Sequence, residues 1–148
     1  IILNTDFAAT LADYAGVNAP ACSEGRSFRD NLKGETPRDW RQSMYYRYWT
    51  HHKIRPAHMG IRGHRYKLMF LYGDPLNATG SDKAPVTPSW EFYDLLADPH
   101  ENHNLYGSPT YAGEIEKMKR ELLKLRREIG DTDAANPRMQ EIMDAYYW

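Results

Sequence analysis

The residues of this 148-residue chain that are most able to do chemistry are histidines, arginines and lysines with aromatic neighbours. The basic members are Arg47, His51, His52, Lys53, Arg55, His58, Arg62, His64, Arg65 and Lys67, and the aromatic ones are Tyr45, Tyr46, Tyr48, Trp49 and Tyr66. Guanidinium and imidazolium groups bind sulfate or carboxylate oxygens, and aromatic faces pack on apolar C–H surfaces, so the mixture fits an anionic sugar. A solvated strand face with core aromatics explains the same residues, and both interpretations stay open here.

The histidines do not have the spacing of a metal site. His51, His52 and His58 lie in or beside one predicted loop, whereas His100 and His103 lie in a turn. No regular set of carboxylates or thiolates accompanies them, as a closed zinc site would require. We therefore predict no metal ligands in this chain.

A complete catalytic centre is not evident either. The sequence has no Gly-x-Ser-x-Gly elbow of a serine hydrolase, and its serines lie mostly in predicted connectors. Gly60 and Gly63 lie within a predicted hairpin and do not open a helix, so they do not form a phosphate-binding loop. We predict no catalytic residue within these 148 residues.

Composition narrows the class of protein. The chain has 41% hydrophobic and 26% charged residues and a formal net charge of -1, which argues against disorder, a membrane span and a nucleic-acid partner. The single cysteine, Cys22, excludes an internal disulfide and a multi-cysteine zinc site. The length fits one domain with a genuine core.

The first elements predict a strand and a helix from the edge of an α/β sheet. Residues 1–3 are apolar, residues 4–6 are N-cap types, and Phe7, Leu11 and Tyr14 follow at helical spacing. No second strand–helix unit completes such a sheet, and the chain begins without a Met or a signal peptide. We therefore expect the rest of the sheet to lie upstream, in a longer protein.

Four strands and two further helices are predicted downstream. A connector at 17–42, with a helical turn or two at 27–33, leads to strands at 43–49, 58–62, 65–72 and 90–95 and helices at 110–129 and 136–148. Gly63 and His64 are predicted to form a two-residue turn between the middle strands. The residues Ile115, Met118, Leu122, Leu125 and Ile129 give the first of these helices one apolar stripe, which should lie on one face of the sheet.

The stretch at 90–105 is the most informative part of the chain. A short aromatic strand ends in Asp98 and Pro99, which favour a turn, and Asn104 can hold that turn from its far side. Nothing in this stretch has the composition of a catalytic centre.

Four segments, in this order, resemble the C-terminal part of type I sulfatases of the alkaline phosphatase superfamily. They are Asn-Thr-Asp-Phe-Ala-Ala-Thr-Leu-Ala-Asp-Tyr-Ala-Gly at 4–16, Gly-Arg-Ser-Phe at 25–28 with Leu32 and Gly34, Gly-Ile-Arg-Gly-His-Arg-Tyr-Lys-Leu at 60–68, and the stretch at 90–105. Ala9 stands where the family usually has Pro, and Gly63 where it often has Thr. Four segments in the right order are far more specific than any one of them.

The resemblance implies an α+β fold, with a four-stranded antiparallel sheet, a long C-terminal helix packed on one face, and a strand–helix remnant of an upstream α/β domain. It divides the chain into residues 1–16 of the catalytic domain, a connector at 17–42, the C-terminal subdomain at 43–130 and a helical extension at 131–148. The formylglycine nucleophile and the Ca²⁺ or Mg²⁺ ligands of the family have no counterpart here and are expected upstream. The implied substrate contacts are His58 first, then His51, His52 and Arg62.

The resemblance therefore implies the C-terminal part of a sulfatase acting on a sulfated carbohydrate, with the upstream catalytic domain as its partner. Two alternatives stay open, namely a related phosphonate or phosphate-ester hydrolase and an anionic-glycan-binding module without turnover. Because bacterial members of this family are often exported, the resemblance implies a periplasmic or extracellular location.

Overall fold

The computed structural model describes the backbone of all 148 residues and every side chain except that of Ala135. The chain divides into two compact units, Ile1–Gln42 and Ser43–Trp148. Each unit has its own internal contacts.

The first unit is built around one long helix. Helix α1 (Asn4–Ala15) ends at Gly16, which takes the left-handed conformation with φ 68°, and α2 (Arg29–Leu32) is a single turn. The carboxylate of Asp6 is fully buried and accepts hydrogen bonds from the amides of Leu3 at 2.7 Å and Arg26 at 2.9 Å. Asp6 thus fastens the helix start to the segment that follows it.

The predicted strand at residues 1–3 is absent from the described backbone, where these residues are irregular and precede α1 directly. A strand requires a neighbouring strand to pair with its backbone groups, and no ladder partner for these residues is described. The helix after them is present as predicted, with Leu3 rather than a residue at 4–6 at the N-cap position.

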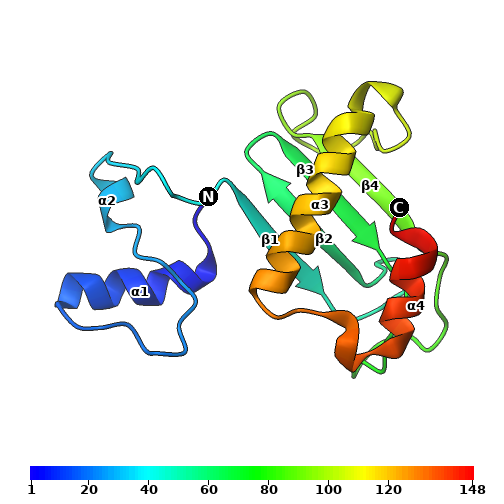
Figure 1. Ribbon diagram of the computed structural model, residues 1–148, viewed down its shortest axis with the longest axis horizontal. Helices are drawn as coiled ribbons and strands as arrows, with labels where there is room; N and C mark the ends of the chain where they lie inside the picture. Colours follow the sequence, from blue (N-terminus) through cyan, green and yellow to red (C-terminus); the bar gives the residue numbers. More distant parts are fainter. The chain divides into compact units, whose positions relative to one another are not determined.

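The second unit contains the predicted antiparallel sheet (Figure 1). Its strands are β1 (Ser43–Tyr48), β2 (His58–Gly63), β3 (Tyr66–Leu71) and β4 (Ser89–Asp94), which pair in sequence order. Residues Tyr46, Gly60, Met69 and Glu91 lie in register across all four strands. The bend between β2 and β3 is at residues 64–65, one residue later than predicted, because Gly63 still pairs with Ser43.

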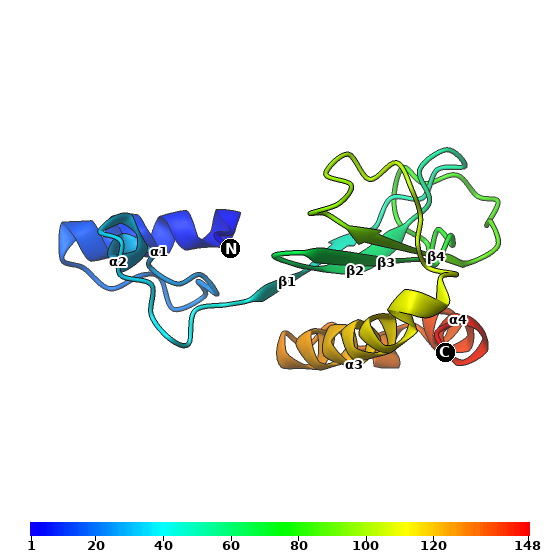
Figure 2. The same ribbon diagram turned by 90° about the horizontal axis from the view of Figure 1, so that it is seen from above.

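Two helices cover one face of this sheet. Figure 2 shows α3 (Ala112–Glu128) and α4 (Pro137–Tyr146) on the same side, and loops rising on the other side. A short 3-10 turn precedes each helix, at Pro109–Tyr111 and Asp133–Ala135. The second helix is present as predicted, and Asn136 caps it, because its side chain accepts a hydrogen bond from the Met139 amide at 3.3 Å.

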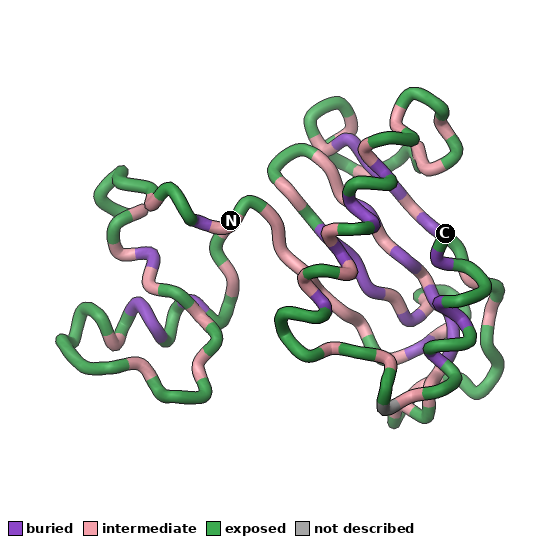
Figure 3. Tube along the Cα trace, viewed as in Figure 1, coloured by how far each residue is buried: buried purple, intermediate pink, exposed green. Residues whose placement is uncertain are grey.

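The core lies between the sheet and these helices, and Figure 3 marks buried residues along the strands of the sheet. Alternate residues of the central strands supply the sheet side of it, and the predicted apolar stripe of α3 supplies part of the helix side. Its members include Met59, Ile61, Leu68, Phe70, Phe92, Ile115, Met118, Leu122, Met139 and Ile142. This packing decides which strand residues remain on the opposite face.

The loop after β4 is fastened to the outer edge of that strand. Asn104 accepts a hydrogen bond from the Phe92 amide and donates one to the Trp90 carbonyl, both at 3.0 Å. Asp98 accepts a hydrogen bond from the His103 amide at 2.8 Å. The predicted roles of Asp98 and Asn104 in this turn are therefore confirmed.

Candidate functional site

The sheet of the second unit has one face that α3 and α4 do not cover, which we call the open face. Because strand side chains alternate, burial of Met59 and Ile61 in the core places His58 and Arg62 on this face. The cross-strand register adds Met44, Tyr46, Tyr48, Lys67, Met69, Leu71, Glu91 and Tyr93 to it. Two of the four predicted substrate contacts therefore lie on one surface.

His58 is held in position by its neighbours. Its Nδ1 atom lies 2.8 Å from the Pro56 carbonyl, which accepts only if Nδ1 carries the proton. Its ring stacks on that of Tyr48, with centroids 5.4 Å apart, and meets Tyr46 edge-on at 6.0 Å. The Nε2 atom is then the ring nitrogen left for another group, as acceptor when His58 is neutral and as donor when it is charged.

Tyr46 lies across the centre of the open face. A Cβ atom built on Gly60 would come within 2.6 Å of the Tyr46 hydroxyl and 2.8 Å of the Leu68 carbonyl, so only glycine leaves room for the ring. The buried hydroxyl has no hydrogen-bond partner among the described atoms. Burial first, and then the charges of Glu101 and Glu91, raise the pKa of Tyr46, so the hydroxyl remains protonated and able to donate.

The charged groups of the open face are only partly neutralised. Lys67 pairs with Glu101 from the loop after β4, and Glu91 accepts a hydrogen bond from the Tyr93 hydroxyl at 3.0 Å. Arg62 is exposed, and no ion pair of its guanidinium occurs among the described side chains. Arg62 is thus the cation of this face that is available to an anionic group.

His51 is placed differently from the other predicted contacts. Its side chain is fully buried, with Nε2 3.0 Å from the Ala84 carbonyl and Nδ1 accepting from the Ala57 amide at 3.3 Å. Both ring nitrogens are therefore occupied by backbone groups. In this geometry His51 holds the β1–β2 loop to the loop before β4 and offers no atom to a substrate.

His52 lies beyond it in the same loop, beside an open groove of about 630 Å³. The groove is lined by His52, Lys53, Ile54, Arg55 and Asp82. The Nδ1 atom of His52 is 3.7 Å from Asp82, whose pKa is held below its ordinary value chiefly by the hydrogen bond from the Lys53 amide. The Arg55 guanidinium lies 5.0 Å from the ring of Tyr48, the same ring on which His58 stacks.

No metal-binding group was found in the described part of the chain, in which no three histidine, cysteine or carboxylate side chains gather closely enough. Among the helices described here, none is both long and apolar enough to cross a membrane.

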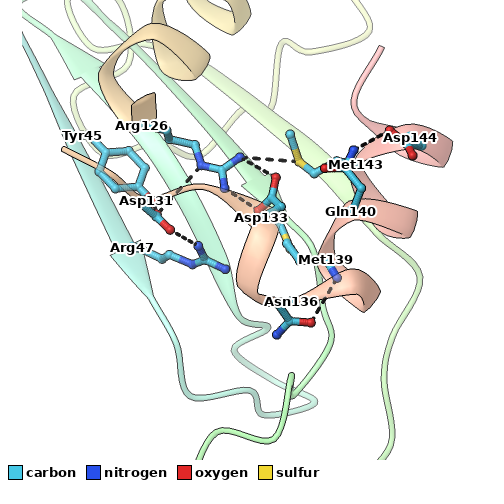
Figure 4. Close-up of polar contacts among 10 residues, drawn as sticks. All are labelled: Tyr45, Arg47, Arg126, Asp131, Asp133, Asn136, Met139, Gln140, Met143 and Asp144. Carbon is cyan, nitrogen blue, oxygen red and sulfur yellow. Dashed lines mark hydrogen bonds and ion pairs between the residues drawn. The ribbon is translucent and has the colours of Figure 1, made fainter. Parts of the chain in front are cut away.

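The sequence did not predict a buried ionic cluster behind β1 (Figure 4). Asp131 accepts hydrogen bonds from the Tyr45 hydroxyl and, at 2.7 Å, from Arg47, while Arg126 donates two to Asp133, at 2.5 and 3.2 Å. The sequence signal available was the pair of acidic residues, Asp131 and Asp133, just after the end of α3. Their spacing does not show that their side chains are buried. The cluster joins β1 to the segment between α3 and α4.

A second missed feature is the enclosed amine of Lys119. It lies 4.3 Å from the Trp90 ring and within 6 Å of the rings of Tyr106, Tyr147 and Trp148. It also donates a hydrogen bond to the Tyr147 carbonyl. Lys119 therefore fastens the end of α4 to α3 and has a structural explanation.

Comparison with known proteins identifies the fold. Residues 1–128 match the family described as "N-sulphoglucosamine sulphohydrolase, C-terminal". The chain belongs to this family. Its fold is that of the C-terminal part of sulfatases of the alkaline phosphatase superfamily, as the sequence resemblance predicted.

Three relatives define the neighbourhood of this sulfatase domain. An N-acetylglucosamine-6-O-sulfatase of Bacteroides thetaiotaomicron is 34% identical over 138 residues, which is 90% of this chain and 22% of the relative. A protein solved with its substrate D-glucosamine-2-N,6-O-disulfate has a TM-score of 0.69 at 31% identity, over 88% of this chain and 25% of that protein. The multifunctional alkaline phosphatase superfamily protein PehA of Trinickia caryophylli is 27% identical over 85% of this chain and 24% of its own length.

These relatives are much longer than the matched region. The chain spans 22–25% of their lengths, so it corresponds to about a quarter of each. The domain is thus homologous to part of known carbohydrate sulfatases, whose remaining length lies outside it.

Proposed function

We propose that this domain is the C-terminal part of an enzyme that hydrolyses sulfate esters of carbohydrates, and that its open face closes one side of the substrate cleft. The observation that carries the proposal is that His58 and Arg62 share the one sheet face not covered by helices, in a domain of the sulfatase family. A sugar bearing sulfate groups is the substrate class, as in the disulfate named for one relative.

The chemistry of the open face fits this role. The Arg62 guanidinium can donate paired hydrogen bonds to sulfate oxygens, and the His58 Nε2 atom lies free at the end of a ring fixed by Pro56 and Tyr48. These groups bind and orient a substrate without taking part in bond cleavage.

The loop residues predicted with them take different parts in the proposal. His52 stays a proposed contact, because the groove beside it is open to solvent and is lined by the basic side chains of Lys53 and Arg55. His51 contributes indirectly, since its buried ring positions the loop that carries His52. Loss of His51 would therefore act through the position of the loop.

The catalytic groups belong to the rest of the longer protein in this proposal. A formylglycine nucleophile and one Ca²⁺ or Mg²⁺ ion are expected there, and the present 148 residues on their own are expected to be inactive. Incubating the purified chain with an aryl sulfate tests this directly. Turnover above that of a heat-killed control would contradict it.

The substrate contacts are tested in the full-length enzyme. His58→Ala and Arg62→Ala should each lower kcat/KM for a sulfated sugar by about tenfold or more, because a charge-assisted contact is lost. The effect should be smaller for a minimal aryl sulfate that lacks the sugar. Lys124→Ala, a change on the solvent side of α3, is the matched control and should leave both substrates unaffected. Unchanged kcat/KM in both open-face variants would remove these residues from the site.

A phosphonate or phosphate-ester hydrolase is the second candidate, because the chain shares its fold with a phosphonate monoester hydrolase of Silicibacter pomeroyi, at a TM-score of 0.60 and 23% identity. The two functions separate when the full-length enzyme is offered matched sulfate, phosphate and phosphonate esters of one alcohol. Preference for a phosphonate ester by kcat/KM would replace the first proposal with this one.

Glycan binding without turnover is the third candidate, supported only by the basic and aromatic groups of the open face. Titration of the chain with sulfated oligosaccharides, and loss of binding when His58 and Arg62 are both changed to Ala, would support it. Absence of binding at millimolar ligand would remove it.

A further inference from the structure

A cavity of about 580 Å³ lies on the helix side of the sheet, away from the open face. Arg126 and Arg127 line it from α3, and Gln140 and Asp144, which lie at i and i+4, line it from α4. Residues four apart share one side of a helix, so α4 presents a continuous side to the cavity. The segment 131–134, which joins the two helices, completes this part of the lining.

The cavity is lined by a buried donor that has no partner. The side chain of Arg126 is only 4% exposed, and its two terminal nitrogens donate to Asp133. Figure 4 shows this guanidinium between Asp131, Asp133 and the sulfur of Met143. The Nε atom carries a further N–H, and no hydrogen-bond partner for it occurs among the described atoms. A buried donor left unpaired costs free energy, which a bound acceptor would recover.

The charges around the cavity cancel one another. Asp131 and Asp133 each form an ion pair with a buried arginine. Arg127 and Asp144 remain, and neither has an ion pair among the side chains that the structure describes, although Asp144 accepts a hydrogen bond from Gln140 at 2.7 Å. An ion of either sign would therefore meet one like charge. A neutral ligand with hydroxyl groups can donate to the carboxylate and accept from the guanidinium.

An exposed indole ring also belongs to this lining. Trp148 is 69% exposed, and its ring meets the buried ring of Tyr147 edge-on, with centroids 5.3 Å apart. The amine of Lys119 lies 5.6 Å from the centre of the same indole. The ring is thus held by buried neighbours while much of its surface stays open. A flat apolar surface beside a few polar groups is typical of a site for a small ligand that has both characters.

We propose that this cavity is a second carbohydrate-binding site, which takes one neutral sugar unit of a glycan. The apolar C–H face of the sugar lies on Trp148, and its hydroxyl groups bind Arg127, Asp144 and the Nε atom of Arg126. No residue of the open face lines the cavity, so this inference goes beyond the proposed function and does not depend on it. A glycan held here keeps its other units at high effective concentration near the protein.

Titration calorimetry of the full-length protein tests the site. The probes are cellotetraose and tetraacetylchitotetraose, which are neutral and whose ring substituents are equatorial, so that each ring has flat C–H faces. We expect saturable binding, with Kd raised about tenfold in Trp148→Ala by loss of the aromatic contact. Kd should rise about tenfold in Arg127→Ala as well, because a hydrogen bond to a charged group is lost.

Both side chains are exposed, so the fold should survive each change, and circular dichroism checks that it does. Lys124→Ala is the matched control. Lys124 lies on α3 close to Arg127 in sequence but does not line the cavity, so this variant should bind both tetrasaccharides as the unchanged protein does.

Three results would overturn the proposal. The first is no heat of binding with either tetrasaccharide at millimolar concentration. The second is binding that survives Trp148→Ala but is lost when His58 and Arg62 are both changed to Ala, which would move the sugar to the open face. The third is a doubling of mass by light scattering that Trp148→Ala abolishes, which would make a second copy the occupant.

Hydrolysis of a sulfated sugar by the unchanged full-length protein, measured in parallel, judges the proposed function separately. A protein that binds cellotetraose through Trp148 but cleaves no sulfate ester would keep this site and reject the sulfatase. An active sulfatase that binds neither tetrasaccharide would do the reverse.

Discussion

Removing one carboxylate from the ionic cluster behind β1 should destabilise the second unit strongly. The Arg126 side chain is only 4% exposed and donates two hydrogen bonds to Asp133, which is 10% exposed. Its Nε atom has no hydrogen bond, since the nearest oxygen of Asp131 is 3.9 Å away. In Asp133→Ala a buried guanidinium would keep only this distant charge and a weak hydrogen bond to the Met143 sulfur at 3.9 Å as partners.

The magnitude follows from the burial. Removing one partner of a buried ion pair costs about 3–5 kcal/mol of stability. Because the attraction to Asp131 remains, the expected loss for Asp133→Ala is about 3 kcal/mol. With a urea dependence of roughly 1.5 kcal/mol per M, the unfolding midpoint should fall by roughly 2 M. Replacing both partners, as Arg126→Met with Asp133→Ala, should restore at least about half of the loss, because no charge is then left buried.

Urea unfolding of the chain, followed by circular dichroism, measures these differences. The matched control is Glu128→Gln on the same helix, which breaks a solvent-exposed pair with Lys124 at 3.6 Å and should cost less than about 0.5 kcal/mol. If Asp133→Ala and Glu128→Gln lower the midpoint equally, or if the double variant is worse than Asp133→Ala, the reasoning about buried charge is refuted.

Three further predictions follow from the second unit. Gly60→Ala should lower stability by about 1–3 kcal/mol in thermal unfolding, because its Cβ would lie 2.6 Å from the Tyr46 hydroxyl; unchanged stability would show that the ring moves at no cost. The hydrogen bonds from Arg65 hold the pKa of Asp94 below its ordinary value. The stability that they give is therefore present above the unfolded pKa and is lost as pH falls through the lower folded pKa. Asp94→Asn should flatten the acid limb of a plot of melting temperature against pH, and an unaltered limb would contradict this. Burial lowers the pKa of Lys119, so as pH rises the native state loses this proton before the unfolded state does. The stability of the protein should therefore rise relative to that of Lys119→Met as pH rises from the folded towards the unfolded pKa. Parallel pH profiles of the two proteins would contradict this prediction.

The helices of the second unit were predictable because their signals are local. The apolar stripe of α3 and the Asn136 cap of α4 depend on neighbours within a few residues along the chain. The strands were found for a similar reason, although Trp49, Tyr72 and Leu95 fall outside the ends observed. Strand ends depend on the partner strand, whose position no single segment encodes.

The candidate site was predicted only in part. The sequence grouped His51, His52 and His58 by their nearness along the chain, whereas folding buries the first, places the second beside a groove and lays the third on the open face. Nearness in sequence does not decide which way a loop side chain points. That choice depends on backbone groups such as the Ala84 carbonyl, which arrive from 33 residues away.

By itself, the sequence determined the four strands, the two long helices, the turn held by Asn104 and the resemblance to sulfatases, because periodicity, caps and motifs are written in adjacent residues. Tertiary structure alone decided that Arg126 and Lys119 are buried, that both ring nitrogens of His51 contact backbone groups, and that His58 shares a face with Arg62. The reason is that pairing, burial and charge compensation are properties of two segments in contact, and they exist only after distant parts of the chain have come together.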